Sequence, residues 1–392
     1  MKKRSFLVVF IITAMMFSVA GTIFAGGQQD GEVVKVGFIG PLTGANAAQG
    51  VGARNSFELA IAQANESGDF PYTIEMVAMD DASNPGTGAS AAMSLVADSE
   101  MVIASGHWNS PVARATIPIF KDNEIPLVIW GAIGSDLTSP ENYPIITRVC
   151  PTEVQENVPL AKFMMDDMKV KKWAILSDTS SYGKGNTEAW KNEVASRSGV
   201  EIISIDEVQV GQTDFKAILS KIKNMKPDAV YFGGVVMEGA LIRRQMHDLG
   251  MGDTLMASIS GMWDDKFIEV ATPSLAEGVI VTKPGVALAK APMGQEFVAA
   301  YEKMGFGEPF GAYGPYAYDA AIVILDALKA VGPDSAKLID AVAGIESEGL
   351  FGTTKFNEYG QTTNVAVTVY VVDDGKWVDF DSSAYSNGGK SF

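Results

Sequence analysis

The sequence predicts an α/β protein made of two doubly wound lobes, each built on a parallel β-sheet. β-Rich apolar runs alternate with amphipathic helical segments, which is the pattern of parallel sheets covered by helices on both faces. This alternation restarts near residue 173, which indicates a second sheet. The chain has 392 residues, which is more than one hydrophobic core usually fills.

The first half contains five expected strands with helical patterns between them. The strands are expected over residues 33–40, 73–79, 101–105, 126–131 and 143–150. After the first strand, Phe57, Ala60 and Ile61 recur at helical spacing on one face. Two further helices are expected, one over residues 84–98 and one beginning near Pro111.

The second half repeats this order. Strands are expected over residues 173–177, 201–208, 228–232 and 254–259, followed by a β run over 365–372 and a short strand at Trp377. Ile242, Met246 and Leu249 lie at helical spacing between two of these strands. There is no internal repeat and no long Pro/Gly/Ser linker, so short segments join the halves. Candidate crossings lie near Pro151 and over residues 282–284.

The composition excludes several classes of protein. There are 47 acidic and 30 basic residues, a net charge of −17, which argues against nucleic acid and anionic lipid as partners. The single cysteine, Cys150, cannot form an internal disulfide or a cysteine-based metal cage. Two histidines leave little material for a zinc site. We therefore predict no metal and no cofactor.

The N-terminal residues have the layout of a secretory signal peptide. Residues 1–4 are positively charged, residues 6–17 are nearly all apolar, and Ala20 and Ala25 are both candidate cleavage points. The alternative is a membrane anchor, but a transmembrane helix needs about 20 apolar residues. We therefore expect residues 1–25 to be a cleaved signal peptide and the mature protein to be periplasmic, without stable membrane insertion.

The candidate ligand site lies in the loops that follow the strands, because ligands of doubly wound sheets meet the carboxyl ends of the strands. These loops are residues 40–44, 106–110, 131–134, 178–183, 233–236 and 258–261. Asn109 and Ser110 are favourable N-cap residues, and Pro111 is suited to the first helical position. A helix start with a hydroxyl group can hold a carboxylate. The alternative is that Asn109 or Ser110 only caps its own helix.

Catalytic motifs are missing. The sequence has no dinucleotide or phosphate-binding glycine loop and no nucleophile elbow. His107 is the one candidate base, and without an identified partner it is best interpreted as structural. His247 is expected on the surface, and Asp80 and Asp81 are expected to be solvated or to cap the next turn. A hydrolase using His107 is therefore the weakest hypothesis, and we predict that the protein is not an enzyme.

These loops resemble those of type I periplasmic binding proteins, especially the leucine/isoleucine/valine-binding component of branched-chain amino acid ABC transporters. The resemblance rests on residues 36–44, 80–82, 106–107, 137–138, 181–185, 231–234, 277–278, 282–284 and 316–320. It implies two lobes joined by three crossing segments, residues 32–151 plus 283–365 and residues 152–282 plus 366–392. It also implies ligand capture by hinge closure and permease subunits as partners.

The resemblance also assigns roles to single residues. Ser110 matches a serine that holds the ligand carboxylate, and Tyr182 matches an aromatic residue that closes over the ligand. Gly131, Ala132 and Ile133 match a loop that faces the groups on the ligand α-carbon, where relatives carry a threonine in place of Ile133. Gln49 and Val235 stand where relatives have tyrosines, and Ser260 stands where they have an acid that pairs with the ammonium group. Ser83 and Asn109 stand where some members have a disulfide.

Large apolar residues near these loops predict a wide apolar pocket, the alternative for each being core packing. They are Trp108, Trp130, Met237, Met262 and Trp263. The leading hypothesis is a substrate-binding protein for a branched-chain or other hydrophobic amino acid, with Trp108 and Asn109 among its ligand contacts. Because Ser260 is not an acid, the alternative is a receptor or sensor of the same fold for an aromatic or aliphatic acid, an amide or urea.

Overall fold

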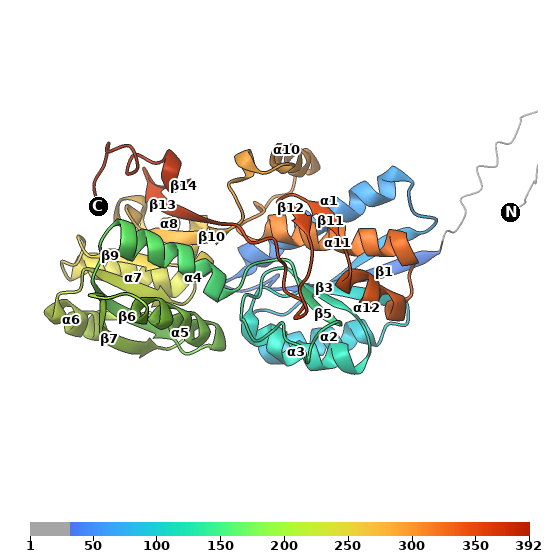
Figure 1. Cartoon of the computed structure of the whole chain (residues 1–392), viewed down its shortest axis with the longest axis horizontal. Coiled ribbons are helices and arrows are strands. Elements are labelled where there is room, and N and C mark those ends of the chain that lie inside the picture. Colours follow the sequence, from blue (N-terminus) through green and yellow to red (C-terminus); the bar gives the residue numbers. More distant parts are fainter. Residues whose placement is uncertain (1–31) are drawn as a thin grey trace, which may run out of the picture. The chain divides into compact units, whose positions relative to one another are not determined.

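The computed structural model describes residues 32–392, which form two parallel-sheet lobes. The predicted signal peptide, residues 1–25, lies outside the described residues. Within the described part, the strands group into a five-stranded sheet, a seven-stranded sheet and a two-stranded hairpin (Figure 1). The predicted fold class is confirmed.

The first sheet is entirely parallel and has the order β2-β1-β3-β4-β5. Its strands are β1 (Val33–Gly40), β2 (Thr73–Asp80), β3 (Met101–Gly106), β4 (Leu127–Ile129) and β5 (Ile146–Arg148). The helices of this lobe are α1 (Ala47–Ser67), α2 (Pro85–Val96), α3 (Ser110–Asp122), α10 (Gly294–Met304), α11 (Gly314–Val331) and α12 (Ser335–Ala343). The last two strands are shorter than the sequence runs that predicted them.

Alternate residues of β1 supply two cores, as the two-residue period of a strand requires. Val36 and Phe38 are buried in the layer that contains α1 and α11. Ile39 points to the opposite face and packs in the layer that contains α2 and α3. Because both faces are covered, the strand is apolar except for Lys35, which forms ion pairs with Asp98 and Glu100, and this explains why the sequence run was easy to recognise.

The second sheet has the order β14-β13-β10-β9-β8-β6-β7. Its strands are β6 (Lys172–Asp178), β7 (Glu201–Val208), β8 (Ala229–Gly233), β9 (Leu255–Ser258), β10 (Ile280–Pro284), β13 (Val367–Asp373) and β14 (Lys376–Asp379). The helices of this lobe are α4 (Glu153–Ala161), α5 (Ser181–Ala195), α6 (Lys216–Met225), α7 (Val236–Asp248), α8 (Asp265–Ala271) and α9 (Pro273–Ala276).

Two features of the second sheet differ from the expected parallel alternation. β13 pairs antiparallel with β10 and with β14, so the sheet ends in an antiparallel edge. The stretch over residues 282–284, expected as a crossing, is the end of strand β10. The hairpin of β11 (Ser347–Gly349) and β12 (Gly352–Thr354) was not predicted from the sequence at all.

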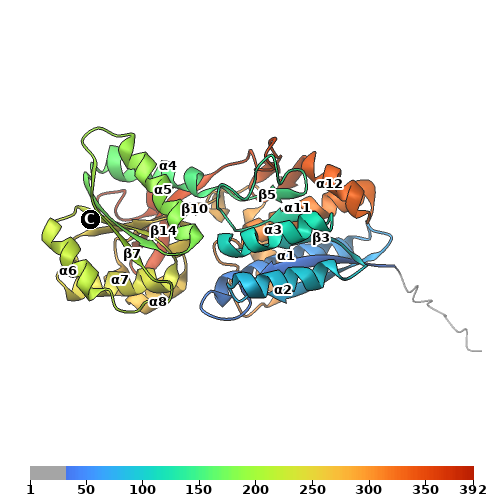
Figure 2. The ribbon, with the colours of Figure 1, turned by 90° about the horizontal axis from the view of Figure 1, so that it is seen from below.

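The chain passes between the lobes three times. It leaves the first sheet after β5, returns after β10, and leaves again between β12 and β13. Figure 2 shows β13 and β14 grouped with the second sheet although they come last in the sequence. The residue limits of the lobes given above stay a prediction.

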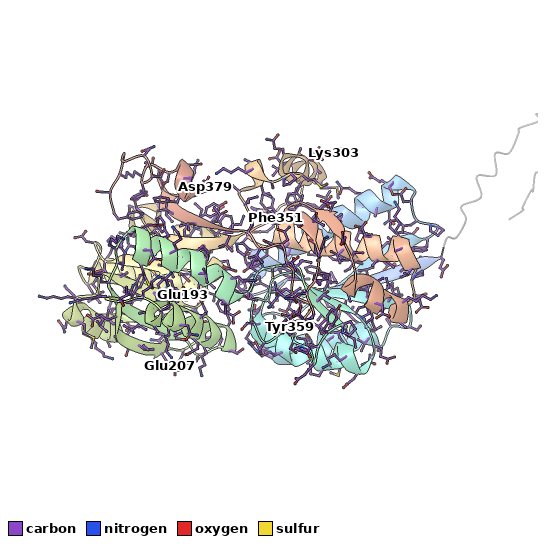
Figure 3. The ribbon with its side chains drawn as sticks, viewed as in Figure 1. Glu193, Glu207, Lys303, Phe351, Tyr359 and Asp379 are labelled. Atoms are coloured by element: carbon purple, nitrogen blue, oxygen red, sulfur yellow. The ribbon has the colours of Figure 1, made fainter. Side chains whose placement is uncertain are left out.

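Glu207 of β7 lies at the outside of the second lobe (Figure 3), and 60% of its side chain is exposed. None of the helices within residues 32–392 has the length and apolar character that a membrane span requires.

Candidate ligand-binding site

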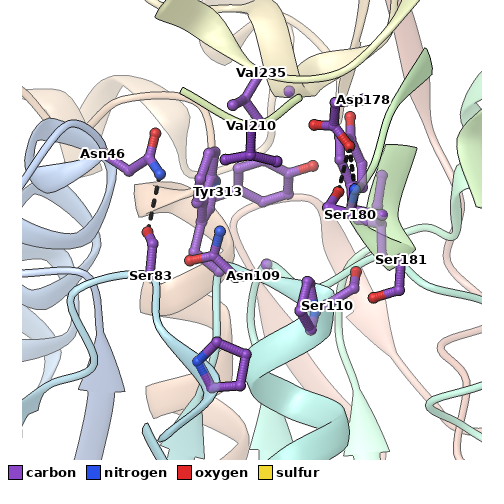
Figure 4. A pocket seen from close by; sticks show the side chains of 17 residues that line it. Asn46, Ser83, Asn109, Ser110, Asp178, Ser180, Ser181, Val210, Val235 and Tyr313 are labelled. Carbon is purple, nitrogen blue, oxygen red and sulfur yellow. Dashed lines mark hydrogen bonds between the residues drawn. The ribbon is translucent and has the colours of Figure 1, made fainter. Parts of the chain in front are cut away.

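A pocket with a cavity of about 260 Å³ lies where loops of both lobes meet (Figure 4). Its first-lobe wall is formed by Asn46, Ser83, Pro85, Trp108, Asn109, Ser110, Pro111, Gly131, Ile133 and Tyr313. Its second-lobe wall is formed by Asp178, Ser180, Ser181, Tyr182, Val210, Val235 and Gly261. The pocket thus occupies the carboxyl ends of the parallel strands, as the fold class predicts.

Six helices begin at this pocket. Asn46, Asn109, Ser180, Val235 and Tyr313 in its wall are the N-cap residues of α1, α3, α5, α7 and α11, and Pro85 is the first residue of α2. A helix start carries a partial positive charge and backbone N–H groups that lack helical partners. The convergence therefore favours an anionic group of a ligand, even though the wall contains neither lysine nor arginine.

The helix start of α3 leaves the Asn109 side chain available. This side chain makes no capping hydrogen bond to its own helix, and its Oδ1 is buried without a partner among residues 32–392. Figure 4 shows the amide projecting into the pocket, toward the side where Val210 lies. The capping alternative thus does not describe Asn109. The α-helix itself begins at Ser110, one residue before the expected Pro111.

Ser110 is tied to the neighbouring glycine-rich loop. Its Oγ accepts a hydrogen bond from the backbone N–H of Gly134 at 3.1 Å, so its own O–H remains free to donate. The buried guanidinium of Arg148 holds the same loop by donating to the carbonyl oxygens of Ala132 (3.0 Å) and Gly134 (2.7 Å). Gly131 lies against His107 and Trp108, where an added Cβ would come within 3.3 Å of both. The loop geometry is therefore fixed by packing before any ligand arrives.

The second-lobe wall contributes an acid, Asp178. Its Oδ1 accepts from the Ser180 N–H at 2.9 Å and from the Ser180 hydroxyl at 2.5 Å (Figure 4). None of the hydrogen bonds described for residues 32–392 uses its Oδ2. Burial raises the pKa of Asp178 to about 6. Asp178 is the only charged residue in the wall formed by these described residues.

Tyr182 is part of the second-lobe wall of the pocket. Its hydroxyl is buried and has no hydrogen-bond partner among residues 32–392, and burial raises its pKa well above the ordinary value. Such a group is available to a polar atom of a ligand. The prediction that Tyr182 faces the pocket is consistent with this position.

A second acid, Glu156 of α4, lies directly behind the wall. Its carboxyl group is fully buried and accepts from the Ser260 N–H (3.0 Å), the Ser260 hydroxyl (2.9 Å) and the Tyr313 hydroxyl (3.3 Å). Burial raises its pKa to about 8. Glu156 does not line the pocket, but its partner Tyr313 does, and its partner Ser260 is next to the wall residue Gly261.

The structure brings most of the predicted site residues together. Seven of them line the pocket: Trp108, Asn109, Ser110, Gly131, Ile133, Tyr182 and Val235. Ala132, Ser260 and Gln49 do not. Ala132 points into the core, Ser260 lies behind the wall, and Gln49 donates from Nε2 to Asp264 Oδ2 at 2.5 Å. The role of all ten as ligand contacts stays a prediction.

The expected cluster of large apolar residues is mostly core. Only Trp108 of the five lines the pocket. Trp130 is fully buried and stacks on Phe38 with ring centroids 5.5 Å apart, and Met262 is fully buried in the second-lobe core. Core packing therefore describes Trp130 and Met262. Other residues form the apolar wall of the pocket, among them Val210 and Tyr313.

Sequence reasoning missed Tyr313 and Glu156. Tyr313 belongs to the first lobe but follows the second crossing, so no local pattern connects it with the earlier loops. Glu156 lies on a short helix with a capping box at Thr152 and Gln155, where an acid is normally solvated. Only the packing between the lobes buries it.

The histidines and the paired acids do not form a catalytic centre. His107 is fully buried, with Nε2 2.7 Å from Thr116 Oγ1 and Nδ1 3.4 Å from Asp81 Oδ2, so the structural interpretation is confirmed. Asp80 caps its own loop by accepting from the N–H groups of Leu42 and Ala82, both at 2.8 Å. His247 lies near the surface as expected, although its ring is half-buried beside Gly252 and burial lowers its pKa.

The fold and the interlobe pocket define the chain as a two-lobed α/β ligand-binding protein, and the comparisons agree. The sequence profile of the periplasmic binding protein family matches residues 33–376. A Leu/Ile/Val-binding protein homolog of Brucella melitensis is 30% identical over 352 residues, covering 89% of this chain and 94% of that protein. The chain therefore belongs to the periplasmic binding protein family, a family of solute-binding proteins and not of enzymes.

Solved structures show the same fold with different ligands. The branched-chain amino acid transporter substrate-binding protein LivJ of Streptococcus pneumoniae, in complex with isoleucine, gives a TM-score of 0.81 at 22% identity, covering 88% of this chain and 98% of that one. A solute-binding protein of an ABC transporter from Rhodopseudomonas palustris, in complex with 3,4-dihydroxybenzoic acid, gives 0.76 at 26% identity, covering 88% and 95%. The family thus fixes neither an amino acid nor an aromatic acid as the ligand.

Proposed function

We propose that this protein is the periplasmic substrate-binding component of an ABC transporter. It captures a small carboxylate-bearing solute, a branched-chain or other hydrophobic amino acid, by closing its two lobes, and delivers it to permease subunits. The observation that carries this proposal is the convergence of six helix starts on one small interlobe pocket. Family membership supports the transport role.

The charges around the pocket support a ligand with both signs of charge. The helix starts favour its carboxylate, with the Asn109 amide and the Ser110 hydroxyl as donors. Asp178 in the wall and Glu156 behind it are acids, and the wall of described residues supplies no basic side chain to balance them. A ligand that carries its own ammonium group can pair with Asp178 in the wall, whereas a simple anion cannot.

The rest of the wall favours an apolar body of modest size. Trp108, Ile133, Val210 and Val235 line the pocket together with the ring of Tyr313. A cavity of about 260 Å³ is slightly smaller than most small-molecule sites, whose volumes begin at about 300 Å³. These properties suit a single hydrophobic amino acid better than a peptide.

Hydrogen bonds between the lobes support capture by closure. Arg114 of α3 donates to Ser181 Oγ of α5 at 2.6 Å, and Gln49 of α1 donates to Asp264 at 2.5 Å. These pairs lie on separate lobes and beside the pocket, so they form only while the lobes are close together. Closure then removes the ligand from water and strengthens its polar contacts.

Calorimetric titration tests this proposal. Leucine, isoleucine, valine and phenylalanine are expected to bind at micromolar or lower concentration, with glycine and lysine as the small and basic controls. Detergent-free co-purification with permease subunits tests the transport role. If neither hydrophobic amino acids nor organic acids bind, the proposed ligand class is wrong.

A second candidate is a receptor for an aromatic or aliphatic acid that lacks an ammonium group. Two points favour it: the resemblance places Ser260 where relatives have an acid, and burial raises the pKa of both Asp178 and Glu156. Benzoate and 4-hydroxybenzoate are the probes for this candidate, with acetamide and urea for a neutral ligand. A receptor of this kind that does not co-purify with permease subunits would indicate sensing instead of transport.

A further inference from the structure

We propose that Asp178 is the residue that pairs with the ammonium group of the ligand, so that an amino acid joins the two lobes by its two charges. The helix starts of the first lobe hold the carboxylate, and Asp178 of the second lobe holds the ammonium group. This proposal rests on the proposed function, because it concerns the same pocket. It assigns the selectivity for amino acids over simple acids to one side chain.

Asp178 is the last residue of β6 and belongs to the wall of the pocket. Its Oδ1 accepts from the N–H and the hydroxyl group of Ser180, whereas none of the hydrogen bonds described for residues 32–392 uses Oδ2. Figure 4 shows Asp178 on one side of the pocket and Asn109 and Ser110 on the other. Oδ2 is therefore the acceptor that this side of the pocket offers to a ligand.

The groups that position Asp178 belong to its own lobe, so opening of the hinge does not displace it. Ser180 lies two residues further along the chain. Gly183, in the first turn of α5, packs so closely that an added Cβ would clash with the Asp178 carboxyl group and with the carbonyl oxygen of Gly233. Glu238 of α7, whose charge also acts on Asp178, lies in the same lobe. Asp178 is thus in place before a ligand brings the lobes together.

Asp178 carries a negative charge whether the lobes are open or closed. In the closed form, burial raises its pKa to about 6, which still leaves the carboxyl group mostly ionised at pH 7. When the lobes open, water reaches the carboxyl group and its pKa moves back toward the ordinary value. Closure over an empty pocket therefore buries a carboxylate without a cation, which is unfavourable, and the ammonium group of a ligand removes this cost.

The position of this acid differs from the one that the resemblance implies. There, the acid that pairs with the ammonium group stands at the position of Ser260, which here is not an acid and lies behind the wall. Among the described residues, Asp178 is the only charged residue in the wall. The buried hydroxyl of Tyr182, without a partner in residues 32–392, offers the ammonium group a second acceptor in the same wall.

The two charges of an amino acid are close enough to act on both lobes. Arg114 in the first part of α3 donates to Ser181 at the start of α5 at 2.6 Å, so the starts of these helices approach each other beside the pocket. The carboxylate and the ammonium group of leucine are attached to the same carbon atom and can reach one lobe each. An acid without the amine interacts by charge with the first lobe only, and Asp178 repels it.

The test compares two ligands and two proteins by calorimetry at pH 7. The ligands are leucine and its amine-free analogue 4-methylpentanoate, and the proteins are the wild type and Asp178→Asn. The wild type is expected to prefer leucine, and Asp178→Asn is expected to lower this preference at least about tenfold, the effect of one lost hydrogen bond between charged groups. Binding of 4-methylpentanoate should stay equal or become tighter, because a repelling charge is removed.

The asparagine variant is suited to this test because it keeps the local structure. Its side-chain oxygen can still accept from the N–H and the hydroxyl group of Ser180. If the variant does not fold, a crystal structure of the wild type with leucine decides the question. The ammonium nitrogen is then expected within about 3.2 Å of Asp178 Oδ2, and an ammonium group bound elsewhere overturns the proposal.

Glu238→Gln is the matched control. Glu238 is a buried acid that acts on Asp178 from the same lobe, but it does not line the pocket. It accepts from the Gly211 N–H at 2.7 Å, and a glutamine oxygen can make the same bond. Its preference for leucine should stay within about threefold of the wild type. A loss as large as that of Asp178→Asn would assign the effect to the general charge of the lobe and overturn the proposal.

The other outcomes separate this proposal from the proposed function. A preference for leucine that survives Asp178→Asn overturns the proposal and leaves the transport function intact. Equal weakening of both ligands does the same, since it is the effect of a disturbed α5 start. Equal binding of both ligands by the wild type overturns the proposal and favours the second candidate. Failure of both ligands, and of the wider panels, overturns the proposed function itself.

Discussion

At the scale of the residue, Asn109 is the side chain on which carboxylate capture depends most. Its amide faces the pocket and makes no capping bond, and its Oδ1 has no partner among residues 32–392. Asn109→Ala is expected to weaken ligand binding about tenfold, the effect of one lost hydrogen bond to a charged group. Asn109→Asp should weaken it further, because it places a negative charge beside the ligand carboxylate.

Asn65 offers the control for this prediction. It exchanges two hydrogen bonds of 2.9 Å with the backbone of Ile74, far from the pocket. Asn65→Ala should lower the melting temperature and leave affinity unchanged in the same titration. Equal affinities of wild type and Asn109→Ala would mean that the carboxylate is held elsewhere.

Glu156 also gives a prediction on stability. The folded state raises its pKa from 4.5 to about 8, so above pH 4.5 the folded protein holds a proton that the unfolded chain has lost. This makes the contribution of Glu156 to stability decrease as pH rises from 4.5 to about 8 and stay constant above it. Glu156→Gln cannot titrate, so its stability relative to wild type should increase over this window.

Urea unfolding at several pH values measures this difference. Each pKa unit corresponds to about 1.4 kcal/mol, so a change of several kcal/mol is expected between pH 5 and pH 8. A difference that does not vary with pH would show that Glu156 is ionised in the folded state.

The sequence reveals a site residue only when a local pattern along the chain places that residue at the pocket. Ser110 and Tyr182 each lie at the start of a helix that directly follows a strand, so chain order alone places them at the pocket. Glu156 and Tyr313 lie outside these loops, and only the meeting of the lobes gives them a role. Trp130 was expected beside the pocket because it follows a strand. Its large side chain is instead fully buried in the core.

At the scale of the element, the position of a buried strand along the chain is easier to predict than its length or the pairing at the edge of the sheet. β1, β6 and β8 are covered on both faces, so their sequences are mainly apolar runs. β5 is only three residues long, and its last residue, Arg148, pairs with Ile129 of β4 while its side chain donates to the glycine-rich loop and to Gln361. The β11–β12 hairpin has no alternating pattern, so its pairing could not be seen in the sequence.

The contacts between α3 and α5 lead to a prediction about closure. Arg114 bridges Asp136 in its own lobe and Ser181 in the other, and it does not line the pocket. Arg114→Ala should weaken all ligands by the same factor, about three- to tenfold, because it shifts the closing equilibrium and not the ligand contacts. Titration of the wild type and of Arg114→Ala, first with leucine and then with a weaker ligand such as valine, measures the loss of affinity for each ligand.

Lys329→Ala is the control, since Lys329 forms an exposed ion pair with Asp69 at 2.7 Å within the first lobe. Such surface pairs contribute little. A loss of affinity that differs strongly between the two ligands would assign Arg114 to ligand recognition instead of closure.

At the scale of the whole molecule, the account predicts that the lobes separate without ligand. Hydrogen bonds between side chains on opposite lobes hold them together, among them those of Arg114 with Ser181, Gln49 with Asp264, Ser135 with Glu153 and Tyr313 with Glu156. These few hydrogen bonds are replaceable by water, so the ligand is the main cause of closure. Small-angle X-ray scattering should therefore show a smaller radius of gyration with saturating ligand, and an unchanged radius would contradict hinge closure.

The central claim is that a carboxylate is held between the lobes at the converging helix starts. A crystal structure of the protein grown with leucine tests it most directly. The account predicts the leucine carboxylate within hydrogen-bond distance of Asn109 and Ser110, with its side chain against Trp108 and Val235. Leucine bound with its carboxylate at Asp178, or outside the interlobe pocket, would contradict the account.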